Sequence, residues 1–133
     1  MDQSEFDGDG QLKNGVFKTY FKDGSLSEIG EFVDGKKHGE WKYYLLSGLL
    51  KATGFYVNGE ISGDWVWYRA NGELMQTGGF TAGKKTGLWK RYHPNGALAD
   101  EGAYVDDKKV GEWKTYDPQG NQIKTRVYRK KTA

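Results

Sequence analysis

Aromatic and small residues along this chain recur with a period of 24 residues. Each period opens with a glycine, carries an aromatic residue two positions later and carries a tyrosine five positions later. The opening glycines are Gly15, Gly39, Gly63, Gly87 and Gly111, the first aromatic positions are Phe17, Trp41, Trp65, Trp89 and Trp113, and the tyrosines are Tyr20, Tyr44, Tyr68, Tyr92 and Tyr116. No insertion breaks the period, and a fixed repeat of 20–50 residues predicts an array of stacked units. We interpret the ten repeated aromatic residues as the structural core of this array.

Each repeat has the pattern of a β-hairpin. The first arm is rich in aromatic and β-forming residues, as in Trp65-Val66-Trp67-Tyr68. The turn is a pair such as Asn71-Gly72 or Asn95-Gly96, which is a strong hairpin signal. No segment has the apolar spacing and the caps of a long helix. The sequence therefore predicts an all-β fold, a single elongated antiparallel meander of about ten strands built from tandem 24-residue hairpins.

Two registers are compatible with the hairpin turns. In Pro94-Asn95-Gly96 the fixed φ of proline suits the first central position of a type I turn, and glycine suits the left-handed position that follows. This three-residue loop sets Tyr92 opposite Leu98. A two-residue turn instead sets Trp89 opposite Gly102, where an aromatic ring covers a bare glycine. The prolines favour the first register.

The faces of the sheet are a second open question. Trp89 and Tyr92 are three residues apart, so a regular strand sends their side chains to opposite faces. Either both faces carry an aromatic row, or a bulge in each first arm brings the two rows together. Gly102 and its equivalents leave room for a large neighbouring side chain to lie flat. We favour the bulge and one continuous face of aromatic residues and leucines.

The two ends of the chain depart from the repeat. Residues 1–13 form an N-terminal segment or a partial repeat, and the run Asp7-Gly8-Asp9-Gly10 lacks the later ligands of a calcium loop. Residues 14–128 form the five repeats. In the last repeat Gln122 replaces the leucine and Arg126 replaces the glycine, which is typical of a polar cap at the end of an array. Residues 129–133 form a basic C-terminal tail.

Composition limits the chemistry that the chain can perform. There is no cysteine, which excludes catalysis by a thiol. His38 and His93 stand at different positions of the repeat, so the sequence offers no repeated histidine site. No phosphate-binding motif precedes a helix, and no metal-ligand spacing is present. We expect no catalytic residue, no cofactor and no metal, and hence no enzyme. A net charge of +2 is too small to indicate nucleic acid by itself. No apolar run has the length of a membrane span or a signal peptide, so we expect a cytoplasmic protein.

Two groups of residues are candidates for binding. Four residues that break the repeat are candidate partner contacts: Tyr43, Phe55, Trp67 and Arg91. Six lysines in the loops between repeats are a candidate basic ridge for an anionic surface: Lys36, Lys37, Lys84, Lys85, Lys108 and Lys109. Glu60-Ile61 interrupts this row. The alternative for the lysines is a set of solvated loops that protect the sheet from aggregation.

The repeated frame Gly-x-Trp-x-x-Tyr-x-x-Asn-Gly-x-Leu, followed by a Gly-x-Tyr, resembles the MORN-repeat variant family across residues 14–128. It looks most like the bacterial group of YwqK-type toxin–antitoxin antitoxins. The resemblance implies an elongated sheet of MORN-like hairpins that acts in protein–protein interaction, scaffolding or membrane association. We therefore expect a non-enzymatic, antitoxin-like module whose partner is a protein, such as a toxin or another copy of the chain. The alternative is a module that binds anionic lipid, or nucleic acid, through the basic ridge.

Overall fold

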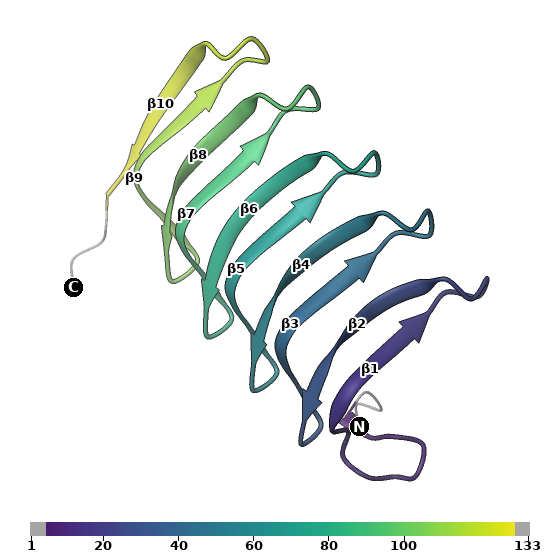
Figure 1. Ribbon diagram of the computed structural model, residues 1–133. Coiled ribbons are helices and arrows are strands. Elements are labelled where there is room, and N and C mark those ends of the chain that lie inside the picture. Colours follow the sequence, from purple (N-terminus) through teal and green to yellow (C-terminus); the bar gives the residue numbers. More distant parts are fainter. Residues whose placement is uncertain (1–4, 130–133) are drawn as a thin grey trace.

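The computed structural model describes residues 5–129 as one antiparallel sheet of ten strands, in which each strand pairs with its neighbours in the sequence (Figure 1). No α-helix is present within this range, and the all-β meander expected from the sequence is confirmed. The strands are β1 (Gly15–Tyr20), β2 (Leu26–Val33), β3 (Lys36–Tyr44), β4 (Leu50–Val57), β5 (Glu60–Tyr68), β6 (Leu74–Thr81), β7 (Lys84–Tyr92), β8 (Leu98–Val105), β9 (Lys108–Tyr116) and β10 (Gln122–Tyr128).

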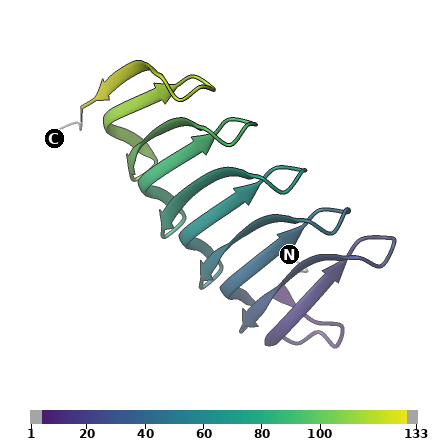
Figure 2. The same cartoon turned by 45° about the horizontal axis from the view of Figure 1, so that its top comes forward.

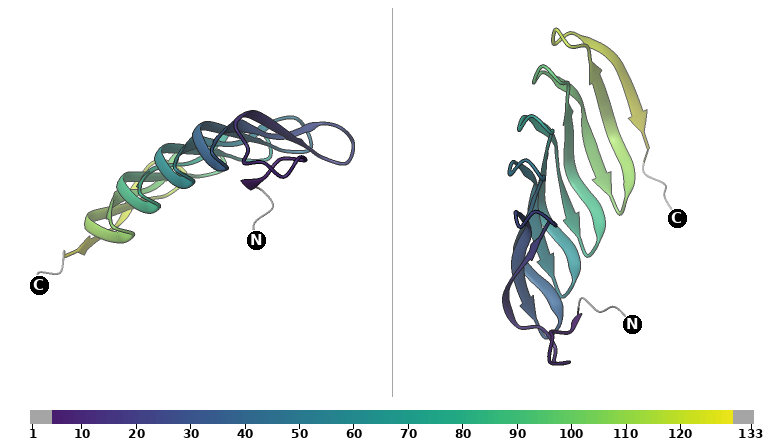
Figure 3. Two further views of the ribbon diagram at one scale, coloured as in Figure 1. Left: turned by 90° about the horizontal axis from the view of Figure 1, so that it is seen from below. Right: turned by 90° about the vertical axis from the view of Figure 1, so that its right-hand side faces the viewer.

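The sheet is an elongated, twisted ribbon whose strands are strongly curved (Figure 3). The longer turns inside the hairpins lie along one side of the ribbon, and the tight turns between hairpins lie along the other side (Figure 2). In the tight turn between β2 and β3 both Asp34 and Gly35 have positive φ, 48° and 82°. Two such residues form the type I′ turn, whose twist matches that of the adjoining strands.

Both registers considered from the sequence occur together in each hairpin. Tyr92 pairs with Leu98, as the loop Pro94-Asn95-Gly96 predicts, and Trp89 pairs with Gly102. The register shifts between these two pairs, because β8 contributes one more residue than β7 at this point. This β-bulge lets the favoured turn and the glycine pairing coexist.

The prediction of one continuous aromatic–leucine face is wrong. A bulge does occur in the first arm, since the register with β2 shifts between Ile29 and Glu31, opposite the segment from Gly39 to Trp41. It lies before the tryptophan, so it leaves the alternation from Trp41 to Tyr44 intact. Trp41 stacks on Tyr43, with ring centroids 6.3 Å apart, and the next residue, Tyr44, therefore points to the other face. We name the side that carries Trp41 the aromatic face and the other side the opposite face.

Each tryptophan at the first aromatic position of a repeat covers a glycine of the preceding hairpin. A Cβ atom placed on Gly54 would lie 1.9 Å from the indole of Trp65. The indole N–H of Trp65 donates to the carbonyl oxygen of Phe55, the residue after this glycine, at 3.2 Å. The same covering occurs at three other places: Trp41 on Gly30, Trp89 on Gly78 and Trp113 on Gly102. An aromatic ring thus covers a bare glycine, but the ring comes from the next repeat and not from the opposing strand of the hairpin.

The core is one layer thick and follows the tryptophan row. Trp41 is 1% exposed and Trp65 is 4% exposed, and the other buried apolar residues are Phe32, Ala52 and Trp89. These side chains lie between consecutive hairpins, so each hairpin completes its core only by contact with its neighbours. This is the arrangement expected of a repeat array.

Both ends of the array have their own local structure. Phe6 and Leu12 form an isolated bridge before β1, and the carbonyl oxygen of Lys13 accepts the N–H of Gly35 at 2.9 Å. At the other end Arg126 takes the glycine position of β10, and its guanidinium carbon lies 4.9 Å from the centre of the Tyr128 ring. Arg126 thus occupies the place where another tryptophan would lie. Of the basic tail, residues 130–133 lie outside the described residues.

Candidate functional site

A stack of five aromatic rings runs along the aromatic face. The rings come from Trp41, Tyr43, Trp65, Trp67 and Trp89, with consecutive centroids 5.5–6.3 Å apart and interplanar angles of 27–32°. We name this stack the ring ladder. Residues from the second strands flank it edge-on, as Tyr56 does against Trp65 at 86°. Offset and edge-on ring pairs of this kind contribute about 0.5–1.5 kcal/mol each beyond the area that they bury.

Two of the four candidate partner contacts lie inside the ring ladder. Tyr43 is half-buried between Trp41 and Trp65, and Trp67 is half-buried between Trp65 and Trp89. These two residues break the sequence repeat, yet they take part in the continuous packing of the aromatic face. Their spacing of two residues from a repeat tryptophan is the signal that places them there. A role in partner binding stays a prediction for both.

The other two candidate contacts lie apart from each other. Arg91 occupies the same repeat position as Tyr43 and Trp67, but its guanidinium pairs with Asp100 and its side chain is 65% exposed. Phe55 precedes Tyr56 in β4, so it points to the opposite face, where it is 42% exposed. The four residues therefore do not form one surface, and their binding roles stay predictions.

A network of hydroxyl and amine groups surrounds Tyr43. Its hydroxyl lies 2.7 Å from the hydroxyl of Tyr56 and accepts a hydrogen bond from Nζ of Lys37 at 3.1 Å. Burial raises the pKa of Tyr43 above its ordinary value, and the hydrogen bond with Tyr56 raises it further. Burial also raises the pKa of Tyr56. The network thus holds a neutral phenol at the edge of the ring ladder.

The six lysines of the candidate basic ridge divide between the two faces. The second lysine of each pair lies over aromatic rings: Nζ is 4.5 Å from the centre of Trp41 for Lys37, 4.9 Å from Trp89 for Lys85 and 4.6 Å from Trp113 for Lys109. The first lysine of each pair is its neighbour in an extended strand, so Lys36, Lys84 and Lys108 point to the opposite face. The six side chains do not form one ridge. Whether these loops bind an anion stays a prediction.

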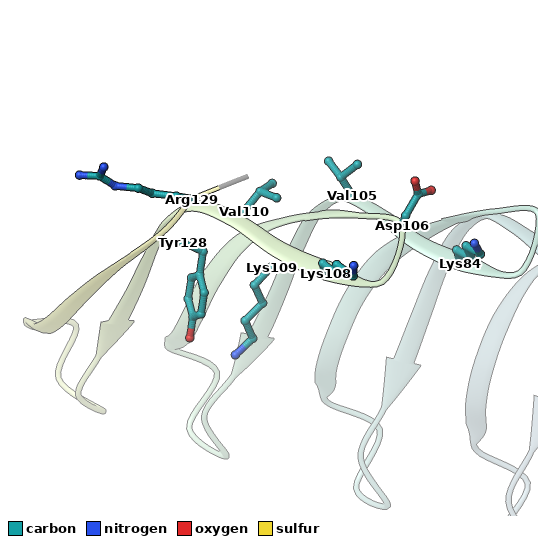
Figure 4. Close-up of a pocket in the computed structure, with 8 residues that line it drawn as sticks. All are labelled: Lys84, Val105, Asp106, Lys108, Lys109, Val110, Tyr128 and Arg129. Atoms are coloured by element: carbon teal, nitrogen blue, oxygen red, sulfur yellow. The ribbon is translucent and has the colours of Figure 1, made fainter. Parts of the chain in front are cut away.

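The opposite face carries a band of exposed apolar side chains. Each member directly precedes or follows an aromatic-face ring in its strand, so alternation places it on the opposite side. The members are Val16, Val33, Phe55, Val57, Leu88, Val105 and Val127, which are 40–67% exposed. Figure 4 shows this division at the C-terminal end, where Val105 and Val110 project from one side of the ribbon and Lys109 and Tyr128 from the other. We name these seven residues the apolar band.

A wide cavity of about 760 Å³ lies at the C-terminal end of the sheet (Figure 4). Its lining joins four cationic side chains to one carboxylate and to residues of both faces: Lys84, Val105, Asp106, Lys108, Lys109, Val110, Tyr128 and Arg129. A second cavity, of about 190 Å³, lies on the aromatic face between β7 and β9 and is lined by Trp89 and Trp113 among others. The lining of the second cavity indicates more clearly what it could bind, because aromatic rings and a pair of opposite charges form its walls.

Titratable groups outside these faces serve local structure. Oδ1 of Asp7 accepts the N–H groups of Asp9 and Gln11, which closes a turn in the acidic N-terminal run. Nε2 of His93 lies 2.7 Å from the carbonyl oxygen of Tyr116, at the end of β9. Across residues 5–129, no three His, Cys, Asp or Glu side chains are grouped as a metal site. The same range holds no helix with the length and apolar character needed to cross a membrane.

Comparisons with known proteins agree with the repeat. The MORN repeat variant model matches residues 13–34, 37–58 and 85–106, which cover the first, second and fourth hairpins. Among curated proteins, none matches. A solved structure described as "Crystal structure of GtfA/B complex bound to UDP and GlcNAc" is similar over 86% of this chain and 23% of that chain, with 11% identity and a TM-score of 0.33. Three of the five hairpins of this chain thus match the model of the MORN repeat variant.

Proposed function

We propose that this chain is a non-enzymatic module that binds another protein through the apolar band of the opposite face. The observation that carries the proposal is the exposure of seven apolar side chains on one face of a one-layer sheet. Single exposed apolar residues are common on protein surfaces, whereas several on the same face of one sheet favour an interaction site. The general association of MORN repeats with protein and membrane binding supports the same class of function.

The alternative is a module that binds an anionic lipid surface, or nucleic acid, through the lysine loops. This alternative needs a dense row of free cationic side chains. Lys37, Lys85 and Lys109 lie over aromatic rings instead. On the opposite face Glu60 stands where Lys36 and Lys84 stand in the neighbouring repeats. The net charge of +2 also favours a protein partner over nucleic acid.

The identity of the partner is the finer part of the proposal. The resemblance to antitoxin repeat proteins favours a protein toxin, which the module would neutralise by covering it. A second copy of the chain is the other partner to consider, because β1 and β10 leave open edges at the two ends of the sheet. Within this proposal the apolar band supplies the contact area, and the charged residues between its members set the orientation.

A capture experiment in extracts of the cells that produce the protein tests this proposal. Val57→Ser combined with Leu88→Ser removes two exposed members of the apolar band, and Lys84→Gln combined with Lys108→Gln is the matched control on the same face. We expect the first variant to lose the partner identified by mass spectrometry, with its melting temperature unchanged because exposed positions cost little. We expect the control to retain the partner, and capture by the wild type to persist at high salt.

The opposite pattern would refute the proposal. If the lysine variant loses its partner, or if capture disappears steeply with added salt, the lysine loops form the binding site. If the partner is a second copy, size-exclusion chromatography with light scattering will show a larger species in the wild type. The Val57→Ser and Leu88→Ser variant then separates a dimer that uses the apolar band from one that uses the sheet edges.

A further inference from the structure

Two sites on the aromatic face, 48 residues apart in the sequence, have the same four walls. The site of the second repeat is formed by Trp41, Lys37, Tyr56 and, from the following repeat, Trp65. The site of the fourth repeat is formed by Trp89, Lys85, Tyr104 and, from the following repeat, Trp113. The edge-on tyrosine has nearly the same placement in both. Its centroid lies 6.1 and 5.4 Å from the two indoles in the second repeat, and 5.5 and 5.1 Å from them in the fourth. The lysine also matches, with Nζ 5.0 Å from the tyrosine ring in each.

In the second repeat the chain fills these walls with its own tyrosine. The ring of Tyr43 lies between Trp41 and Trp65, at centroid distances of 6.3 and 6.1 Å. Its hydroxyl meets Nζ of Lys37 and the hydroxyl of Tyr56. The second repeat therefore shows directly which side chain these four walls accommodate, and how its polar end is bound.

In the fourth repeat the filling side chain is absent. Arg91 stands at the position of Tyr43, and Asp100 stands at the position of Ala52. Nε of Arg91 bonds both carboxylate oxygens of Asp100, at 2.9 and 3.1 Å, so the guanidinium is held by this carboxylate. A cavity of about 190 Å³ remains between Trp89 and Trp113. We name it the slot.

The size of the slot limits its occupant. Pockets for whole small-molecule ligands have volumes of about 300–1,000 Å³, so the slot has room for roughly one planar ring. Two indoles suit the faces of such a ring. Nζ of Lys85 and the hydroxyl of Tyr104 are the counterparts of the two groups that meet the hydroxyl of Tyr43.

We infer that the slot binds the side chain of a tyrosine presented by a partner protein, with its hydroxyl toward Lys85 and Tyr104. The slot lies on the face away from the apolar band, so this second site does not depend on the function proposed above. Its lining carries Lys85, Lys109 and Arg91 against the single carboxylate of Asp100. This charge excess favours a tyrosine with acidic residues beside it in the partner.

A titration with N-acetyltyrosinamide tests the inference without knowledge of the partner. The indole N–H resonances of the wild-type protein are followed by NMR while the amide is added to millimolar concentration. We expect saturable shifts at Trp89 and Trp113, and none at Trp41, whose neighbouring site is filled by Tyr43. N-acetylphenylalaninamide lacks the hydroxyl, and we expect it to bind about 3- to 10-fold more weakly.

Two variants separate the slot from general binding to the face. Arg91→Tyr combined with Asp100→Ala rebuilds the pair Tyr43 and Ala52 in the fourth repeat, and we expect it to abolish the shifts. Lys85→Ile places the residue found at Ile61, the equivalent position of the third repeat, so the fold tolerates it. Because Tyr104 remains, we expect this variant to bind N-acetyltyrosinamide more weakly than the wild type does, without losing all preference for it, and to bind N-acetylphenylalaninamide with unchanged affinity.

Three results would overturn the inference. The first is the absence of saturable shifts at Trp89 and Trp113 in the wild type. The second is an unchanged response in the Arg91→Tyr and Asp100→Ala variant, which would place the ligand elsewhere. The third is equal affinity of the wild type for the two amides, which would mean that the slot does not recognise a phenol. The first and third results use the wild type alone, so they decide the question even if the double variant does not fold.

Discussion

Replacement of Gly54 by alanine tests the contact that joins consecutive hairpins. The added Cβ atom would lie 1.9 Å from Cδ2 and 2.0 Å from Cε2 of Trp65. The indole has little freedom to move, because its N–H donates to the carbonyl oxygens of Phe55 and Ser62, at 3.2 and 3.1 Å. The ring also packs against four neighbouring rings. Gly54→Ala therefore forces the indole away from the sheet.

The size of the effect follows from what the indole of Trp65 loses. An aromatic side chain buries about 150–250 Å², which corresponds to at most about 4–6 kcal/mol at about 25 cal/mol per Å². A small shift with partial repacking costs about 1–3 kcal/mol, as in other overpacked cores. Because Trp65 is 4% exposed and fixed by two hydrogen bonds, we expect a loss of about 3–5 kcal/mol in the free energy of unfolding. This corresponds to a fall of roughly 10–20 °C in the melting temperature.

Urea unfolding, followed by tryptophan fluorescence and near-UV circular dichroism, measures the loss. Gly8→Ala is the matched control, since no atom lies within 4 Å of the Cβ position at Gly8. Arg126 gives a second control within the chain, because this glycine position is not covered by a following tryptophan, and Arg126→Ala should change stability little. If Gly54→Ala unfolds within about 0.5 kcal/mol of Gly8→Ala, the covering of glycine by tryptophan does not stabilise the array.

Three further predictions concern the core and the titratable groups. Trp65→Ala and Trp89→Ala should each lower the free energy of unfolding by about 3–5 kcal/mol in denaturant, and near-wild-type values would contradict their core role. The raised pKa of Tyr43 means that its neutral form is favoured by folding. Its contribution to stability is complete below the unfolded-state pKa of about 10 and is lost as pH rises above it, so Tyr43→Phe should flatten the loss of stability that urea unfolding measures above about pH 10. Hydrogen bonds from Asn121 hold the pKa of Asp117 below its ordinary value, so its contribution is present at neutral pH and is lost as pH falls through the folded-state pKa, which an NMR titration measures.

The architecture could be predicted from the sequence because the same hairpin pattern occurs in five consecutive repeats. Spacing gave the strands, and turn chemistry gave the pairing of Tyr92 with Leu98. Alternation could also have separated Trp41 from Tyr44, but the preference for one aromatic face required a bulge between them. Sequence composition does not say where in a strand a bulge falls. Gly39, with a φ of 74°, places it before the tryptophan.

Contacts between hairpins were less predictable than contacts within them. Trp89 pairs with Gly102 across the hairpin, which the sequence offered as one of two registers, yet the indole of Trp89 lies on Gly78 of the preceding repeat. The position of the indole depends on the direction in which the side chain leans along the sheet, and the pattern of residues does not indicate this direction. For the same reason Tyr43 and Trp67 stood out from the sequence as irregular, and only their neighbours show that they complete a stack.

Candidate binding residues were least predictable, because binding depends on what remains after packing. Nothing in the sequence distinguishes adjacent lysines such as Lys84 and Lys85. In an extended strand their side chains point to opposite faces, and that of Lys85 lies over Trp89. The slot exists because Arg91 stands where the second and third repeats have an aromatic ring. Arg91 pairs with Asp100 on the neighbouring strand, and both residues line the slot.

Because each glycine is covered by the tryptophan of the next repeat, hairpins can be added or removed without changing the residues at the junctions. Every internal junction uses the same pair of residues, so a duplicated or deleted block of 24 residues leaves matching surfaces on both sides of the cut. Each added block moves the two ends of the sheet apart by two strand spacings, or about 9.6 Å. The length of the molecule is thus set by copy number alone. In a chain of this kind, the distance between the two end strands changes in whole repeats while the end strands themselves stay the same.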